Sequence, residues 1–208
     1  MTIVYPLAFP TVTGPARARI FTQAAVGMTE SPFTYQSQAQ KNQGQRFGME
    51  ITLGELKLDE AAAWVPFLVS LNGRWGSFLA GDTARATPRG VAAATPGTPL
   101  VKGGGQTGDQ LVIDGAPAST TDYLKAFDYI QLGTGAATHL HMVLEDADTD
   151  AGGEVTLTLW PDLRVSPADN DPVVVSAAKG LFRLTTNKTD WIERATLFGV
   201  RFPAVEAL

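Results

Sequence analysis

The chain has 208 residues, 44% of them hydrophobic and 18% charged, a composition that predicts a folded protein able to bury a core. Its net charge of −5 and the absence of any basic run argue against bulk electrostatic attraction to nucleic acid. The chain has no cysteine, which excludes disulfide bonds and cysteine-ligated metals, and no apolar run reaches the roughly 18 residues of a membrane span. The 21 glycines and 13 prolines are typical of a turn-rich β protein.

The N-terminal segment, residues 1–16, is extended and interrupted by Pro6, Pro10 and Pro15. It lacks the basic start and the long apolar core of a signal peptide, so we expect the protein to be made in a cytoplasm and to stay there or assemble there. Two structural interpretations are open. The segment is either a strand lying on a neighbouring subunit or a loosely held terminus.

Alternating apolar residues predict three strands in the next part of the chain. They are residues 17–28, 33–38 and 45–56. The apolar face of the third strand comprises Phe47, Met49, Ile51 and Leu53. The glutamine-rich segment 36–45 precedes this strand, and we interpret it as a hairpin tip or an exposed loop.

One helix is predicted, at about residues 59–72. Its apolar residues recur at helical spacing and form one face, which comprises Trp64, Phe67, Leu68 and Leu71. We expect Asp59 to cap the N-terminus, because its carboxylate can accept hydrogen bonds from the free amides of the first turn. Gly73 is expected to end the helix, and Pro66 to kink it or distort its first turn. The simplest arrangement lays the apolar face on a β-sheet.

Residues 82–170 differ in character from the chain before them. Up to about residue 105 the chain is rich in proline, glycine, alanine and threonine, as in an irregular linker. Four compact strand signals follow, at residues 110–113, 129–132, 138–144 and 154–160. A polar loop, residues 145–153, joins the last two of these strands. We interpret residues 82–170 as a small, barrel-like inserted β domain.

The C-terminal part again shows the strand-like alternation of apolar residues seen in the N-terminal part. Strands are predicted at residues 173–175, 180–185 and 194–205. A long last strand that pairs with an early strand would unite residues 1–81 and 171–208 in one domain. The predicted fold class is therefore mainly β: a β-sandwich with one packed helix, split by the insert.

An acidic loop invites comparison with a calcium site. Asp146, Asp148 and Asp150 alternate, as at the start of an EF-hand loop. Such a loop needs glycine at its sixth position and glutamate at its twelfth, where this chain has Ala151 and Leu157. We therefore interpret the loop as a solvated hairpin tip.

Two further motifs have a structural interpretation. His139 and His141 share one face of a predicted strand, but a zinc site usually needs a third ligand and no cysteine is present. Residues 103–108 are glycine-rich like a phosphate-binding loop, but the lysine that would follow is missing, which favours a flexible turn. We predict no catalytic residue, no cofactor-binding residue and no metal site, and expect that the protein is not an enzyme.

The tryptophans Trp64, Trp75, Trp160 and Trp191 are predicted to lie in a core or an interface. Trp160 ends a predicted strand just before Pro161, where an aromatic ring could stack on a sugar. This gives the alternative function, a carbohydrate-binding module formed by residues 82–170.

Several short motifs, in this order, resemble a family of structural proteins. They are Ser31-Pro32-Phe33-Thr34, Gly44-Gln45-Arg46-Phe47, Ala62-Ala63-Trp64, Leu71-Asn72-Gly73-Arg74-Trp75-Gly76-Ser77-Phe78, Gln106-Thr107-Gly108, Asp128-Tyr129-Ile130-Gln131-Leu132-Gly133, His139-Leu140-His141, Leu144-Glu145-Asp146-Ala147-Asp148, Trp160-Pro161-Asp162-Leu163-Arg164 and Lys179-Gly180-Leu181-Phe182-Arg183-Leu184. Over residues 30–208 the chain resembles the distal tail (Dit-type) tail-tip proteins of siphophages and phage-like gene transfer agents.

This resemblance implies a structural role in a virion. Such proteins are β-sandwiches with a helix that form a hexameric ring between the tail tube and the tail-tip hub. The implied partners are other copies of the chain, the tail tube protein, the hub protein, DNA that passes through the lumen without specific binding, and a possible host surface glycan. The implied location is the virion tail tip, after synthesis in the bacterial cytoplasm. A net charge of −5 suits a lumen that repels DNA.

Overall fold

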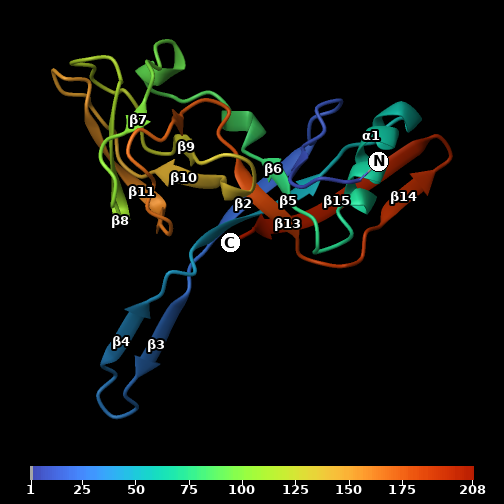
Figure 1. The fold of residues 1–208 in the computed structure, drawn as a ribbon. Coiled ribbons are helices and arrows are strands. Elements are labelled where there is room, and N and C mark those ends of the chain that lie inside the picture. The colour runs from blue at the N-terminus through green and yellow to red at the C-terminus, as the bar shows by residue number, and fades with distance from the viewer. Residues whose placement is uncertain (1) are drawn as a thin grey trace.

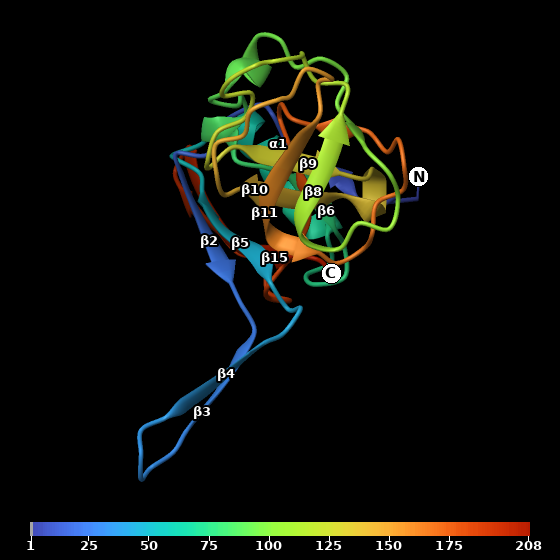
Figure 2. The same ribbon diagram turned by 90° about the vertical axis from the view of Figure 1, so that its left-hand side faces the viewer.

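The computed structural model describes residues 2–208 (Figure 1). These residues form two large sheets, a two-stranded ribbon and a single α-helix. The predicted class, mainly β with one packed helix and a barrel-like unit, is confirmed. The ribbon projects from the body of the molecule in both views (Figures 1 and 2).

The first sheet is built from the two ends of the chain. Its strands are β1 (Leu7–Ala8), β2 (Arg17–Gln23), β5 (Arg46–Thr52), β6 (Phe78–Ala80), β13 (Gly180–Leu184), β14 (Trp191–Arg194) and β15 (Leu197–Glu206). Their order is β1-β6-β13-β15-β5-β2, and β14 pairs with one end of β15. The long last strand pairs antiparallel with the early strand β5, as predicted, with Phe202 opposite Ile51.

The inner face of the first sheet is apolar because alternate residues of each strand point to it. On β5, Phe47, Met49 and Ile51 are each at most 4% exposed. The helix α1 (Leu58–Ser70) contributes to the same core. The predicted helical face is buried there in full, with Trp64, Phe67, Leu68 and Leu71.

The ends of α1 differ from the prediction at one point. The N-cap is Lys57, not Asp59, because Lys57 keeps an extended backbone and its amide donates to the Glu60 carboxylate at 2.8 Å. Asp59 lies inside the first turn. Gly73 follows the helix with a positive φ of 62°, the left-handed geometry that was predicted to end it.

The second sheet is formed by the middle of the chain. Its strands are β7 (Leu100–Val101), β8 (Gly108–Asp114), β9 (Tyr129–Leu132), β10 (His139–Val143), β11 (Val155–Leu163) and β12 (Val173–Val174), in the order β12-β9-β10-β11-β8-β7. The two outer strands approach each other: Leu100 forms a bridge to Pro172, and the Val101 amide donates to the Asp171 carbonyl. The sheet is therefore a nearly closed barrel with its own core.

The two sheets share an aromatic junction. The Phe47 ring of the first sheet lies 4.7 Å from the Trp160 ring and 6.0 Å from the Tyr129 ring of the second. Gly180 lets β13 of the first sheet lie close to β10 of the second, because a Cβ there would come within 2.9 Å of the Leu140 Cβ. Both sheets thus contribute to one continuous hydrophobic cluster.

Two expectations for the middle of the chain need correction or refinement. Residues 173–175 were assigned to the first domain, but β12 pairs with β9 and belongs to the second sheet. Residues 82–105 are mostly irregular, as predicted, but they include two 3₁₀ turns, η1 (Thr83–Arg85) and η2 (Val91–Ala93), and the short strand β7. The buried Asp128 carboxylate holds this segment by accepting from the Arg89 amide at 2.7 Å and the Gly90 amide at 3.3 Å.

Both interpretations of the N-terminal arm are wrong for the described residues. The arm is neither laid on a neighbouring subunit nor loosely held, because β1 pairs in parallel with β6 of the same chain. Tyr5 donates its hydroxyl to the Ser70 carbonyl at 2.6 Å. Phe9 packs edge-to-face on Trp64 with ring centroids 4.9 Å apart. The arm completes the core around α1.

Two strand boundaries were also misplaced. The predicted strand 17–28 is two strands, because the chain leaves the first sheet after Gln23 and starts the ribbon strand β3 (Val26–Glu30). Its partner is β4 (Ser37–Lys41), so half of the segment predicted as a hairpin tip or an exposed loop, residues 36–45, is strand. The predicted strand 194–205 is likewise divided, because Ala195 turns with a φ of 51° between β14 and β15.

Candidate assembly interface

The ribbon β3–β4 is the most unusual feature of the surface. Five residue pairs join its two strands, from Val26 opposite Lys41 to Glu30 opposite Ser37. Every residue of both strands is exposed. A two-stranded hairpin alone in water is marginally stable at best, because neither face is covered. We interpret the ribbon as a candidate contact surface.

The side chains of the ribbon support this interpretation. Val26 and Met28 share one face of β3 and are 54% and 65% exposed. At the tip, Phe33 is 92% exposed and Tyr35 is 77% exposed. Exposed apolar side chains gathered on one element are typical of protein–protein contact sites.

The tip has a defined shape. The Ser31 hydroxyl accepts hydrogen bonds from the Phe33 and Thr34 amides at 3.4 Å, and Tyr35 turns the chain with a φ of 55°. The base of the ribbon is held to the body by an ion pair between Lys41 and Asp162 at 2.7 Å. The ribbon is therefore fixed at its root and presents two aromatic rings at its far end.

A hollow lies beside β14. It has a volume of about 550 Å³ and is lined by Trp191, Ile192, Val200 and Pro203 among others. Trp191 is 41% exposed and Ile192 is 59% exposed. The hollow has apolar walls together with the charged residues Glu50, Asp190 and Arg201, and its volume lies within the range of ligand-sized clefts.

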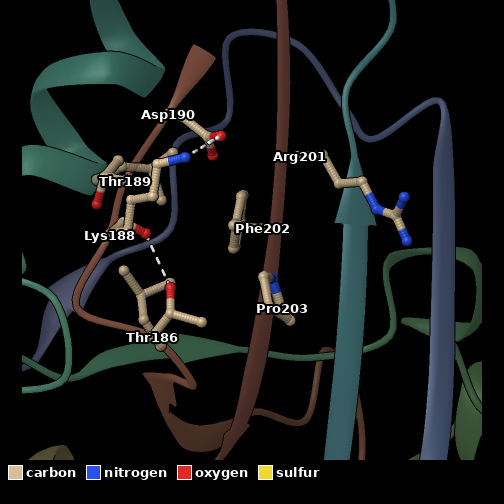
Figure 3. A pocket seen from close by; sticks show the side chains of 9 residues that line it. Thr186, Lys188, Thr189, Asp190, Arg201, Phe202 and Pro203 are labelled. Carbon is tan, nitrogen blue, oxygen red and sulfur yellow. Dashed lines mark hydrogen bonds and ion pairs between the residues drawn. The ribbon is translucent and has the colours of Figure 1, made fainter.

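Figure 3 shows a second, smaller hollow between α1 and β15, with a volume of about 230 Å³. Lys188 and Asp190 form an ion pair at 3.3 Å there, and the Thr186 hydroxyl donates to the Lys188 carbonyl at 2.8 Å. The charged side chains of the pair are more than 70% exposed. Arg201 lines the same hollow but extends away from this pair, toward β5. The hollow gathers no buried acid or base.

The acidic loop stabilises turns. Asp146 accepts from the Ala126 amide at 2.8 Å, and Asp148 accepts from the Asp122 amide at 2.7 Å. Asp150 accepts from the amides of Glu154 and Gly152, and these hydrogen bonds lower its pKa. No group of three possible metal ligands occurs among residues 2–208. The three aspartates are exposed, as expected of a solvated loop, and their carboxylates also cap backbone amides.

The two histidines lie at the wall of the barrel. His141 is buried, and its Nδ1 donates to the Pro161 carbonyl at 2.7 Å. Burial lowers the pKa of His141 to about 4, so the ring is neutral near pH 7. Burial also lowers the pKa of His139, which is only half-buried. The structural interpretation of this pair agrees with these contacts.

In the glycine-rich segment 103–108, the side chain of Gln106 occupies the inside of the turn. The Gln106 amide donates to the carbonyls of Lys102 and Val112 and accepts from the Val112 amide at 2.7 Å. The backbone groups of this turn are therefore hydrogen-bonded to the Gln106 side chain.

Trp160 does not form the exposed sugar platform that the alternative function requires. Its ring is half-buried and packs edge-to-face on Phe47 at the junction of the sheets. The most exposed tryptophan is Trp75, at 76%, beyond the end of α1.

An ion pair at the same junction was not predicted, because no local sequence pattern brings its two residues together. Arg164 Nη2 lies 3.6 Å from the Glu206 carboxylate, which also accepts from the Phe47 amide at 3.1 Å. Burial raises the pKa of Glu206 and lowers that of Arg164.

The chain matches no protein-family model, and no curated protein is significantly similar to it. Within residues 2–208, no helix has both the length and the apolar character needed to cross a membrane.

Proposed function

We propose that this protein is a structural virion component, a distal tail ring adaptor that joins the tail tube to the tail-tip hub of a long-tailed phage or phage-like particle. The observation that carries the proposal is the ribbon β3–β4, which is fully exposed, projects from the body and carries aromatic residues at its tip. The resemblance to distal tail proteins supplies the neighbours: the tube on one side and the hub on the other.

A ring requires a head-to-tail contact, in which one surface of each copy meets a different surface of the next. The ribbon tip and the hollow beside β14 are two such surfaces on one chain. We propose that Phe33 and Tyr35 of one copy occupy the hollow lined by Trp191 and Ile192 of the next copy. Repetition of this contact around an axis closes a ring, with six copies as in the family that the chain resembles.

Purified protein is expected to form closed rings with an open centre, seen by negative-stain microscopy and counted by native mass spectrometry. If rings need a template, addition of the tail tube protein is expected to produce them. A chain that stays monomeric at high concentration, both alone and with the tube protein, would contradict the proposal.

The variant Phe33→Ser/Tyr35→Ser is expected to weaken association at least tenfold, because buried aromatic side chains supply much of the energy of an interface. Ile192→Ser is expected to act similarly from the other side. Trp75→Ser removes an equally exposed aromatic residue outside both surfaces and serves as the control.

Mixing the two kinds of variant tests the pairing directly. Copies with serine at positions 33 and 35 keep an intact hollow, whereas copies with serine at position 192 keep an intact ribbon. Each pair can form one native contact, so the mixture is expected to give heterodimers without rings. Monomers alone in this mixture would show that the ribbon and the hollow do not meet.

A further inference from the structure

Five arginines gather on the outward face of the first sheet. Opposite residues of an antiparallel pair point to the same side of a sheet. Arg17 and Arg201 both lie opposite Thr52, and Arg19 lies opposite Glu50 two residues along β5. The same register adds Arg46, opposite Gln23, and Arg183, opposite Val205. We call these five residues, on β2, β5, β13 and β15, the arginine face.

The arginine face differs in charge from the rest of the chain. On this side of the four strands, Glu50 is the single acidic residue, so five arginines and one glutamate give a charge of +4. The chain has 16 basic and 21 acidic residues, so the remaining 11 and 20 give −9. A net charge of −5 therefore conceals a strongly basic sheet surface.

Most of the guanidinium groups are exposed to solvent, and Arg46 donates to the Gln23 side chain at 2.8 Å. Arg17, Arg19, Arg183 and Arg201 are exposed, and Arg46 is half-buried. Glu50 lies 3.3 Å from Arg19 and 3.4 Å from Arg201. No ion pair within residues 2–208 involves Arg17, Arg46 or Arg183. Arg17, Arg19 and Arg201 also line a common hollow of about 460 Å³.

The chemistry of the face fits a phosphate chain. Guanidinium groups bind phosphate oxygens through paired hydrogen bonds, and strands about 4.8 Å apart distribute them over a surface instead of around one ion. Protein interfaces usually have an apolar centre. Here the largest apolar ring, Phe21, lies against Gly48, and Arg19 lies 5.6 Å from its centroid. We infer that the arginine face binds the phosphate backbone of nucleic acid without reading its sequence.

This inference goes beyond the proposed ring, since a single chain carries the whole face, although Arg201 and Glu50 also line the hollow beside β14. It is tested with the full-length protein and a fluorescent DNA duplex of about 30 base pairs, by anisotropy from about 50 to 200 mM salt. Binding is expected at the low-salt end. For about four phosphate contacts, the logarithm of the binding constant is expected to fall with the logarithm of salt with a slope near −3.6.

Arg17→Glu/Arg201→Glu is expected to weaken DNA binding at least tenfold and to reduce the salt slope by about 2. The control, Lys57→Glu/Arg74→Glu, makes the same charge change beside the two ends of α1, which packs on the opposite face. Arg17→Gln/Arg183→Gln alters two arginines without ion pairs, so a graded loss there excludes a folding defect caused by broken pairs.

Three results would overturn the inference. The wild-type protein could fail to bind the duplex at 50 mM salt. The control could weaken DNA binding as much as the arginine variants do. That result would show that binding depends on the net charge of the protein and not on the arginine face. The wild-type protein could bind polyglutamate through these arginines without binding DNA. That result would identify the face as a docking surface for an acidic protein.

Discussion

Trp64→Ala is expected to lower the free energy of unfolding by about 3–5 kcal/mol, the usual cost of truncating a large buried aromatic side chain. Trp64 is fully buried and packs against Phe9, Phe67 and Phe202. These contacts join the N-terminal arm, α1 and the first sheet, so the cavity would lie where three parts of the fold meet. Urea unfolding followed by circular dichroism measures the loss.

Two further variants separate cavity formation from loss of a tryptophan in general. Trp75→Ala changes a side chain that is 76% exposed and is expected to alter stability by no more than about 0.5 kcal/mol. Trp64→Phe is expected to cost much less than Trp64→Ala, because it keeps most of the ring volume and removes a buried indole N–H that has no hydrogen-bond partner. Equal losses for Trp64→Ala and Trp75→Ala would contradict the position of Trp64 in the core.

Trp64 also shows what the sequence can predict. The apolar face of α1 was identified correctly because helical periodicity is a local property, repeated within a dozen residues. The buried face of β5 was identified for the same reason, since alternate residues of one strand share one side. The predicted cap at Asp59 failed because Lys57 and Glu60 satisfy each other across the start of the helix, an arrangement that residue type alone does not favour.

The candidate surfaces were less accessible to sequence analysis. Alternation continues on both sides of residues 24–25, so the pattern does not reveal that the chain leaves one sheet and enters a free ribbon there. The arginine face was invisible because Arg17 and Arg201 become neighbours only through their shared partner Thr52. A charge count over the chain averages this face with acidic loops elsewhere. Register between distant strands decides where charge gathers, and no local pattern encodes it.

The buried His141 gives the second large effect, a loss of stability in acid. Its folded-state pKa is lowered by burial to about 4, whereas the ordinary value is 6.5. Between these two values the unfolded chain binds more protons than the folded chain, so stability rises with pH. The contribution is fully present above pH 6.5 and is lost as the pH falls toward 4. A shift of this size corresponds to about 3 kcal/mol.

Glu206 acts in the opposite direction. Burial raises its pKa, so the folded chain holds this proton to a higher pH than the unfolded chain does. Its contribution to stability therefore decreases as the pH rises above the ordinary glutamate value. The pH profile of the wild-type protein is consequently a sum of opposing effects, and the part that belongs to His141 has to be isolated with a variant.

His141→Asn provides that variant, because its amide can still donate to the Pro161 carbonyl but does not titrate. The difference in unfolding free energy between wild type and variant is expected to shrink by about 3 kcal/mol from pH 7 to pH 4, measured by urea unfolding at each pH. His139→Asn is the matched control, and a smaller change is expected because His139 is only half-buried. Parallel pH profiles for wild type and His141→Asn would show that His141 is not held neutral in the folded chain. In that case the constant offset between the two profiles would reflect only the altered packing around Pro161.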